Sequence, residues 1–469
     1  MRCCSCLSVV VLQLALLTPA SANSPRPALR RPSIERQASL LAASGDRAGP
    51  SQAATSGIVP TAFQIINNVA GAGILTLSAG MAAGIGWVPA IAVCIALGMI
   101  SGFTFYLLGE ACALTGTTTF KDLWAATLGE SSSWVVDVCI GLMCLASCTI
   151  YSGILGDVFT PLLNVAGVPA RFNTRSTNII VLAAAVLAPL SLLEDLTKLA
   201  FTSMLGCLAV LYTVLFIARR ALDGSYVSGP LLDALPAALA PSFTASSMWR
   251  LDANAFVLVS NLGLAFIAHY NAPAFYSSLT DATPRRFGLS VGLAFLCLTL
   301  LYMACMGLGY YTFGDAAASN IMLNYARSDG LAVVARLATG FSILFGFPLA
   351  MLGLVTSARG LAETGAAAAG PESRLAAPLR AAAQPTGRRA LVLGSLALVT
   401  TVAVLLTDIG LIVGISGAVL GAAIVYVIPA MIALRAGGAG GGAVAKATLY
   451  GLVPLGAVIG VLGVVMTLK

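Results

Sequence analysis

The sequence predicts an all-α polytopic membrane protein with about 11 transmembrane helices. Of its 469 residues, 58% are apolar and only 9% are charged. The apolar residues gather in runs of about 20, the length that a helix needs to cross a bilayer. Two of these runs are interrupted by amides and glycines near their middle. Together these observations exclude a soluble protein and indicate one that handles a solute within the membrane.

The first interrupted run is Thr61 to Leu75. Amides at Gln64, Asn67 and Asn68 precede a Gly-Ala-Gly sequence, in which each glycine weakens a helix by about 1 kcal/mol. In hydrocarbon every backbone N–H and C=O needs a partner, so an unwound stretch survives only where it is buried in protein or lines a cavity. Half-helix ends at such a break carry partial charges that attract ions and charged solutes.

The second interrupted run covers about Phe256 to Leu279. Its middle holds Asn261, Gly263, His269, Asn271 and Pro273. Each interrupted run opens a group of five apolar spans. This order predicts a core of five plus five helices related as an inverted repeat.

The remaining spans follow from the apolar runs, and two stretches rich in small residues predict flexible loops, Ala362 to Thr386 and Gly437 to Gly442. The loops on the N-terminal side carry more of the basic residues, which predicts the cytosolic or stromal side there. The eleven spans are expected at about residues 59–82, 87–111, 134–163, 177–193, 197–218, 254–279, 289–313, 332–356, 389–407, 411–434 and 448–468.

The N-terminal residues look like targeting sequence. Residues 1–22 form a signal-peptide-like segment, with an apolar run from Leu7 to Leu17 and Ala20-Ser21-Ala22 as its cleavage site. Residues 23–57 are a Ser/Ala/Arg-rich leader or tail, of the composition of a transit peptide. This pair predicts the plastid envelope or an endomembrane as destination. The alternative is an ordinary signal peptide with a disordered tail, and the plasma membrane. Residues 58–469 then form one transporter domain.

Cysteine usage and charge exclude two other classes of site. Three of the eleven cysteines lie in the leader, the other eight lie in or beside spans, and there is a single histidine. We therefore predict neither a metal site nor a disulfide framework. The net charge of +7 comes from basic residues scattered through loops, which does not predict nucleic-acid binding.

Several motifs occur in a specific order and spacing over about 400 residues. Their residues are Asn67 with Gly71, Gly73, Ile74 and Leu75; Thr119 to Leu123 with Leu128 and Gly129; Pro189 to Leu193 with Leu199 and Ser203; Ala265, Phe266, His269 and Tyr276; Gly309 to Asp315 with Asn324 and Tyr325; Arg336 to Ala338 with Pro348 and Leu349; and Asp408, Ile409, Gly414, Gly417, Ala418, Gly421, Pro429 and Ala430. With these motifs the chain resembles the amino acid/auxin permease family, and within it the sodium-coupled neutral amino acid transporter branch.

The resemblance implies eleven helices, a core like that of the bacterial leucine transporter, and transport of amino acids by alternating access. It implies no cofactor beyond a coupling ion. It also implies that Asn67 forms a cation site with the eighth span. That span offers Thr339 and Ser342 in a register that differs from the threonines of the branch. Sodium and proton therefore both stay open as the coupling ion.

We expect the substrate at the two interruptions. Backbone N–H groups of Ala70, Gly71, Ala72 and Gly73 would bind a carboxylate, and carbonyl groups around Asn261, Ala265 and Phe266 would bind an amino group. This pair of contacts recognises the zwitterion that amino acids share. For Phe266 the alternative is ordinary packing, and for Asn67 it is a hydrogen bond between helices.

Two ionisable residues are candidates for a proton relay. His269 is the only histidine and lies within a span, where its charge could change near neutral pH. The alternative is a neutral histidine whose nitrogens are satisfied in the core. Asp157 is the second candidate, because it lies deeper in a span than the other acidic residues.

The sequence as a whole predicts a secondary active transporter of small neutral amino acids that uses a sodium or proton gradient. The alternative is an amino-acid-sensing membrane protein with the same fold and little transport. An enzyme is not expected, because no histidines or carboxylates cluster on one membrane face. The expected partners are the amino acid and membrane lipid, without nucleic acid, and the oligomeric state stays open.

Overall fold

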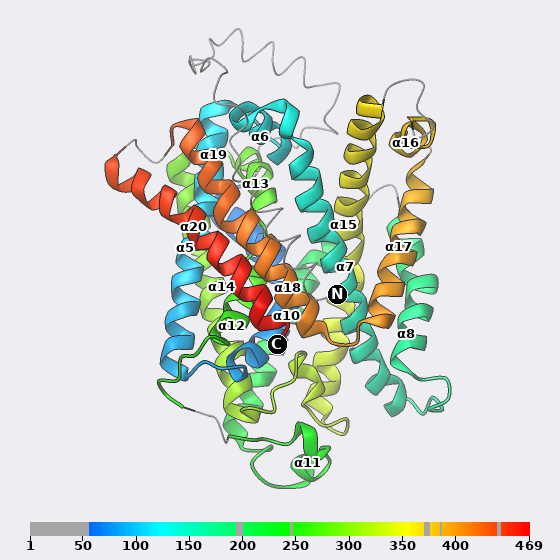
Figure 1. Cartoon of the computed structure of the whole chain (residues 1–469). Helices are drawn as coiled ribbons and strands as arrows, with labels where there is room; N and C mark the ends of the chain where they lie inside the picture. The colour runs from blue at the N-terminus through cyan, green and yellow to red at the C-terminus, as the bar shows by residue number, and fades with distance from the viewer. Residues whose placement is uncertain (1–55, 194–199, 244–246, 370–375, 385–386, 439–441) are drawn as a thin grey trace.

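The computed structural model describes residues 56–469 apart from 194–199, 244–246, 370–375, 385–386 and 439–441 (Figure 1). It is 81% helical, and no strand occurs in these described ranges. In this described part of the chain ten helices are long and apolar enough to cross a membrane, and an eleventh span results if the bent pair Ile58–Val69 and Gly73–Ala82 counts as one. The predicted fold class is thus confirmed. The inverted relation of the two halves stays a prediction, and residues 1–55, with most of the predicted leader, lie outside the described residues.

The first half of the bundle contains the first interrupted span. Its elements are α3 (Ile58–Val69), the 3-10 helix η1 (Ala72–Thr76), α4 (Leu77–Ala82), α5 (Trp87–Thr115), α6 (Phe120–Leu128), η2 (Glu130–Ser132), α7 (Trp134–Val165), α8 (Arg175–Leu182), the π-helical turn η3 (Ala183–Leu187), α9 (Ala188–Leu192) and α10 (Ala200–Asp223). Short helices α11 (Pro230–Asp233) and η5 (Ala237–Leu239) follow at the end of the molecule drawn lowest in Figure 1.

The second half contains the second interrupted span. Its elements are α12 (Ala255–Ala265), η6 (His269–Asn271), α13 (Ala272–Ser278), α14 (Pro284–Phe313), η7 (Ile321–Leu323), α15 (Gly330–Ala369), α16 (Ala376–Ala383), α17 (Arg388–Leu405), α18 (Ile409–Ser416), the π-helical η9 (Gly417–Val427), α19 (Ile428–Ala436) and α20 (Ala443–Thr467).

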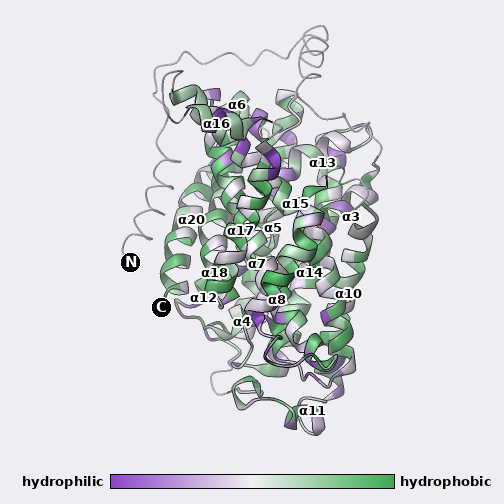
Figure 2. Ribbon diagram, turned by 90° about the vertical axis from the view of Figure 1, so that its right-hand side faces the viewer, coloured by the Kyte–Doolittle hydropathy of each residue, from purple (hydrophilic) through white to green (hydrophobic). Residues whose placement is uncertain are grey.

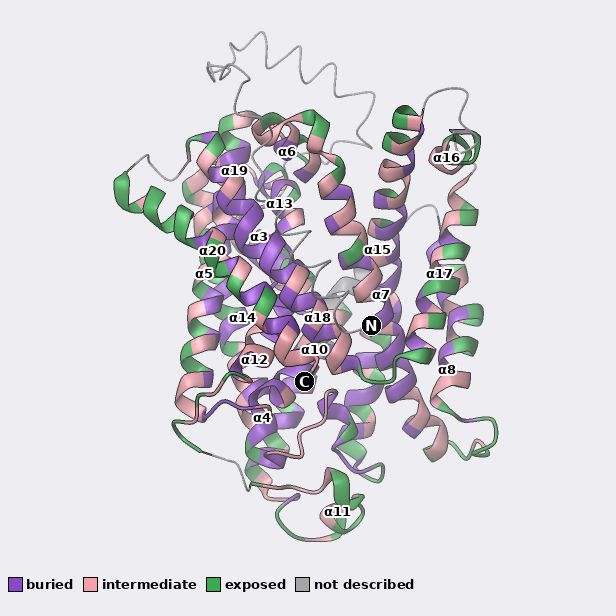
Figure 3. Ribbon diagram, in the orientation of Figure 1, coloured by how far each residue is buried: buried purple, intermediate pink, exposed green. Residues whose placement is uncertain are grey.

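Burial separates inner spans from outer ones. In the most apolar window of Ile409–Ala436, 83% of residues are buried, and in that of Ala255–Ser278 72% are. The values fall to 28% for Arg175–Leu192 and 22% for Arg388–Leu405. In Figure 3 the inner helices α12 and α18 are mostly in the buried colour, whereas α8 and α17 carry exposed side chains. Most of these exposed residues are apolar, among them Ile180 and Val181 on α8 and Leu393 and Leu398 on α17. The hydrophobic colour also predominates along the middle of the bundle in Figure 2, so the outer face suits hydrocarbon.

Polar side chains fix where several helices begin. The hydroxyls of Thr119, Thr174 and Thr283 accept a hydrogen bond from the N–H group three residues later, and the Asp408 carboxylate accepts one from Gly410. Each cap satisfies a backbone donor that the first helical turn leaves free. These four residues therefore set the first residue of α6, α8, α14 and α18.

A cluster of hydrogen-bonded side chains joins the C-terminal end of α10 to the residue before α15. Arg220 makes two hydrogen bonds to the Asp329 carboxylate, at 2.6 and 2.9 Å, and Tyr226 donates a third to the same group at 3.0 Å. Burial raises the pKa of the Tyr226 hydroxyl above its ordinary value, so the hydroxyl stays a donor. Arg336, only 2% exposed, donates to the carbonyls of three residues in the preceding loop, the shortest bond being 2.6 Å to Tyr325. The loop before α15 is thereby held in place.

One predicted loop is helical for much of its length. The stretch from Ala362 to Thr386 was expected to be flexible, but α15 continues to Ala369 and α16 covers Ala376–Ala383. The expectation was wrong there because alanine has the highest helix propensity of all residues. The Arg359 guanidinium also donates two hydrogen bonds to the C=O of Ala383, at 3.0 and 3.2 Å, which fixes α16 against α15.

Candidate functional site

The first interruption lies between α3 and η1. The N–H of Ala70 donates to the C=O of Ile66 at 2.8 Å, and the N–H of Gly71 turns back to the C=O of Val69, also at 2.8 Å. Gly71 has an extended backbone, with φ −103° and ψ −162°. The half-helices on its two sides meet at 55°. The helix therefore ends at the Gly-Ala-Gly sequence, as predicted.

The second interruption lies between α12 and η6. Beyond Ala265 the N–H of Ile267 reaches only to the C=O of Leu264, at 3.2 Å, and Ala268 has φ −155° and ψ 13°. The helix restarts with Pro273 in its first turn. Proline has no N–H, and its ring crowds the carbonyl four residues before it, so a continuous helix cannot run through this point. Such a break needs no glycine.

The two interruptions lie against each other. The hydroxyl of Tyr302, on α14, is 2.7 Å from the C=O of Ala265 and 3.2 Å from the C=O of Val69, the last residues of the two half-helices. A Cβ atom added to Gly73 would come within 3.3 Å of the Cα atom of Ala265. One buried hydroxyl thus serves both broken ends, and the glycine permits their close approach.

Polar groups from three elements border the breaks on their other sides. A Cβ atom on Gly71 would lie 3.3 Å from the hydroxyl of Tyr151, on α7. The amide of Asn271 donates to the amide oxygen of Asn68 at 3.1 Å, and this pair is exposed, unlike Tyr302. The breaks therefore have a buried side at α14 and a more accessible side at the two asparagines.

The residues predicted to bind substrate all belong to these two interrupted spans. Asn261 lies one turn before the second break, is 3% exposed and donates to the C=O of Thr76 at 3.2 Å, while its Oδ1 atom has no hydrogen-bond partner among the described residues. The others are Ala70, Gly71, Ala72 and Gly73 at the first break and Ala265 and Phe266 at the second.

The Phe266 side chain is fully buried. Its ring centroid lies 4.8 Å from that of Tyr302 and 6.0 Å from that of Phe295. These are the contacts of ordinary packing, the alternative to a role in selectivity. In this conformation only the backbone of Phe266 is part of the break.

Two of the three predicted cation ligands lie near one point between α3, α10 and α15. A Cβ atom on Gly206 would be 3.2 Å from the Ser342 hydroxyl and 3.7 Å from the Asn67 Oδ1 atom. The thiol of Cys207 also donates to that Oδ1 atom, at 3.1 Å. Asn67 and Ser342 thus offer two neutral oxygen ligands to one small volume, which suits a hard cation better than a soft one.

The third predicted ligand, Thr339, faces elsewhere. Its hydroxyl lies 3.2 Å from that of Thr213 on α10, and the Thr213 hydroxyl donates to the C=O of Ala209 at 2.9 Å. Thr339 therefore supplies the proton of the bond between the two threonines. It lies one helical turn before Ser342, and in this conformation it joins α15 to α10.

His269 lies behind the second break, between α12 and α5. Its Nε2 atom is 3.0 Å from both the C=O of Ser101 and the hydroxyl of Thr104, and the side chain is 0% exposed. A carbonyl can only accept, so Nε2 carries a proton. The Nδ1 atom has no partner among the described residues, and the Phe105 ring stands edge-on at 5.3 Å between centroids. Both recorded hydrogen-bond partners of this histidine, Ser101 and Thr104, belong to α5.

Asp157 takes part in an ion pair. The Arg175 Nε atom lies 2.8 Å from its Oδ1 atom, and the Asn320 amide donates to its Oδ2 atom at 3.3 Å. Arg175 also donates to the C=O of Ala403 at 2.9 Å. The pair therefore links α7, α8, the loop before α15 and the end of α17. A proton-relay role would require this ion pair to open.

The sequence did not single out Tyr302, Tyr151 or Cys207. Nothing in their local patterns marks them, because each is an ordinary residue of an apolar span. Their place at the site follows only from contacts with residues that are far away in the sequence. The separations are 233 residues for Tyr302, 80 for Tyr151 and 140 for Cys207. Among the residues that the structure describes, no group of His, Cys, Asp and Glu could hold a metal ion.

Comparisons with known proteins agree with this architecture. A family model described as "transmembrane amino acid transporter protein" matches residues 54–468. The putative sodium-coupled neutral amino acid transporter 11 of Danio rerio is 28% identical over 321 residues, which cover 67% of each chain. The amino acid transporter AVT6C of Arabidopsis thaliana is 26% identical over 63% of this chain and 68% of its own.

A third relative has an intracellular membrane in its name. The vacuolar amino acid transporter 5 of Schizosaccharomyces pombe is 26% identical over 63% of this chain and 67% of its own. The match spans between 58% and 68% of the length of each of eight curated relatives. These three relatives carry the names of amino acid transporters, and a further one, of Homo sapiens, is named as a solute carrier; transporters are not enzymes.

Proposed function

Because the chain belongs to the transmembrane amino acid transporter family, we propose that it is a secondary active transporter of small neutral amino acids, driven by a sodium or proton gradient. The observation that carries the proposal is the meeting of two broken helices at one tyrosine hydroxyl. Two helix ends within the membrane leave backbone N–H and C=O groups that need hydrogen-bond partners. The carboxylate and the amino group of a zwitterion are complementary to these two kinds of group. The chain is an integral, multi-pass membrane protein.

The carboxylate of the substrate would bind the N–H groups of Ala72 and Gly73, where η1 begins and its dipole is positive, and those of Ala70 and Gly71 once their bonds to the C=O groups of Ile66 and Val69 open. The amino group would bind carbonyls at the end of α12, including that of Ala265, which has a second lone pair besides the one that accepts from Tyr302. Tyr151 beside Gly71 is a further polar contact within reach of the carboxylate. The side chain of the substrate then meets apolar neighbours, which favours small neutral amino acids.

For coupling, Asn67 and Ser342 are the proposed cation ligands, with Thr339 joining them if its bond to Thr213 opens. Binding a cation at the Asn67 Oδ1 atom would replace the hydrogen bond from Cys207. Because the cation would sit where α3, α10 and α15 meet, its binding would hold the first broken span against the other two helices. Proton coupling through His269 or Asp157 is the second form of the proposal.

The test is uptake by the full-length protein reconstituted in liposomes, with labelled alanine and glutamine, under either a sodium or a proton gradient. Asn67→Ala is the site variant, and Gln64→Ala, an exposed amide one turn earlier on α3, is its matched control. Sodium-driven uptake that is lost in Asn67→Ala and kept in Gln64→Ala supports the cation site. Uptake driven by protons and lost in His269→Gln or Asp157→Asn supports the second form.

Two results would count against the proposal, the first against transport and the second against coupling. Specific amino acid binding without accumulation under either gradient would favour the sensing alternative. Accumulation that equals that of the parent protein in all four variants would leave transport but remove Asn67, His269 and Asp157 as coupling residues.

A further inference from the structure

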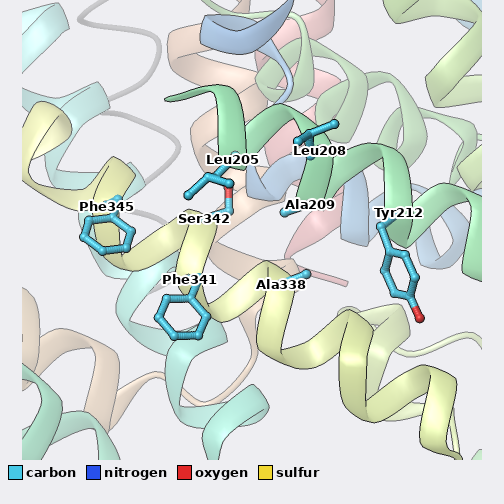
Figure 4. A pocket seen from close by; sticks show the side chains of 9 residues that line it. Leu205, Leu208, Ala209, Tyr212, Ala338, Phe341, Ser342 and Phe345 are labelled. Atoms are coloured by element: carbon cyan, nitrogen blue, oxygen red, sulfur yellow. The ribbon is translucent and has the colours of Figure 1, made fainter. Parts of the chain in front are cut away.

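A groove opens between α10 and α15 on the outer face of the bundle. It encloses about 320 Å³, and Figure 4 shows the side chains that line it on the two helices. None of the described residues that line it is charged. Leu208 and Phe341 are 54% and 56% exposed, and the rings of Phe341 and Phe345 stack at 6.4 Å between centroids. The lining residues are Leu205, Gly206, Leu208, Ala209, Tyr212, Ala338, Phe341, Ser342 and Phe345.

The exposed stripe of α10 that forms the groove continues to a basic residue. Leu205, Leu208, Tyr212, Leu215 and Arg219 follow each other at intervals of three or four residues, so they share one face of the helix. The Arg219 side chain is 69% exposed. Its nearest carboxylate, Asp223 at 3.7 Å, already accepts a hydrogen bond of 2.9 Å from Arg220. The Arg219 guanidinium is therefore only partly neutralised by Asp223 and can pair with an anion at the membrane surface.

The spacing along α10 matches one leaflet of a bilayer. From Arg219 to Leu208 the helix rises by about 16 Å, at 1.5 Å per residue. Half of the hydrocarbon core of a bilayer is about 15 Å thick. A lipid whose phosphate lies beside Arg219 would thus place the end of its acyl chain in the groove, close to the middle of the membrane.

We propose that the groove between α10 and α15 binds an acyl chain of an anionic phospholipid whose phosphate pairs with Arg219. The apolar lining fits the chain, the exposed guanidinium fits the headgroup, and the length of helix between them fits the lipid. Gly206 and Ser342 form the inner wall of the groove and also border Asn67, so the bound chain would fix the separation of α10 and α15 beside the proposed cation ligands. Lipid binding does not depend on the transport proposal, whereas its effect on the cation site rests on it.

The experiment uses the full-length protein in bilayer nanodiscs with phosphatidylglycerol that carries a photoreactive group near the end of one acyl chain. After irradiation, the labelled peptides are identified by mass spectrometry. We expect labels on α10 and α15 at the groove, and competition by unlabelled phosphatidylglycerol but far less by phosphatidylcholine. Labels spread evenly over the outer helices would overturn the site, and equal competition by both lipids would overturn the headgroup contact.

Two variants with matched controls separate the parts of the proposal. Arg219→Gln should weaken binding of the anionic lipid roughly fivefold, the factor expected from one basic contact near an anionic surface. Its control is Arg285→Gln, an exposed arginine at the start of α14. Ala338→Phe fills the groove and should abolish labelling there, whereas Ala92→Phe on the exposed face of α5 should not. Unchanged labelling in both test variants would refute the proposal, and Arg219→Gln, a surface change, remains informative if Ala338→Phe does not fold.

Discussion

The first interrupted span turns by 55° between its halves, whereas the second runs on as Ala255–Ser278 despite its break. The surroundings explain the difference. At Gly71 in the first break the nearest neighbour is a side chain, the Tyr151 hydroxyl at 3.3 Å, although Gly73 meets the backbone of Ala265 at the same distance. The second span packs backbone to backbone, because a Cβ atom on Gly263 would meet the C=O of Gly417 at 3.1 Å. A span held by backbone contacts has little freedom to bend, and one held by side chains can change its angle when a rotamer changes. The second span should therefore tolerate an added side chain at its contact with η9 less well than the first span tolerates one at Gly71.

The largest effect is expected where the second span packs on η9. A Cβ atom on Gly417 would overlap the C=O of Ser260, so Gly417→Val should destabilise the protein by about 3 kcal/mol or more, the upper end of the overpacking range. Thermal unfolding in detergent measures this. Gly292→Val is the control, because Gly292 is an exposed helix residue with nothing within 4 Å of an added Cβ atom. Similar losses in both variants would mean that helix propensity, and not the contact, decides.

Next comes the hydroxyl that joins the two breaks. Tyr302→Phe leaves the C=O of Ala265 buried without its short bond, which should cost about 2 kcal/mol of stability. Uptake should fall more than stability alone explains, because both half-helices lose their common partner. Tyr450→Phe, on the exposed face of α20, serves as the control in the same unfolding and uptake measurements. A variant that unfolds and transports like the parent protein would show that the two breaks are held by packing alone.

The positions of the spans could be predicted from the sequence, but the side-chain contacts between spans could not. Apolar runs mark each membrane crossing, because the bilayer imposes one length on all of them. Gly71 and Pro273 mark the two breaks through backbone chemistry that is local. Tyr302 carries no such mark, since its role depends on which neighbours the folded bundle brings to its hydroxyl.

Two further differences have the same cause. The glycines at 71 and 73 showed no packing reason in the sequence, and the structure supplies Tyr151 and Ala265 as the neighbours that need the space. Asp157 stood out as a solitary acid in a span. Its partner Arg175 lies only 18 positions away, but two helix ends and a loop separate them, so their distance depended on a turn that periodicity does not fix.

A moderate effect is expected at the first break. Gly71 has a negative φ, so the backbone there accepts alanine. An added Cβ atom would meet one atom of another helix, the Tyr151 hydroxyl at 3.3 Å. Gly71→Ala should therefore cost about 1 kcal/mol, the lower end of the overpacking range. Adding Tyr151→Phe should return most of that stability, because the double variant removes the hydroxyl that the new methyl group meets. A double variant no more stable than Gly71→Ala would place the strain in the backbone and weaken the contrast between the two spans.

The smallest effect is expected at the exposed tie between the two spans. The Asn271 amide competes with water for the Asn68 oxygen, so a double-mutant cycle with Asn68→Ala and Asn271→Ala should give a coupling energy of about 0.5 kcal/mol or less. A stronger coupling would make this side as firm as the Tyr302 side and would leave no preferred direction of opening. With a weak coupling the two halves separate most easily at the asparagines while Tyr302 holds them at α14.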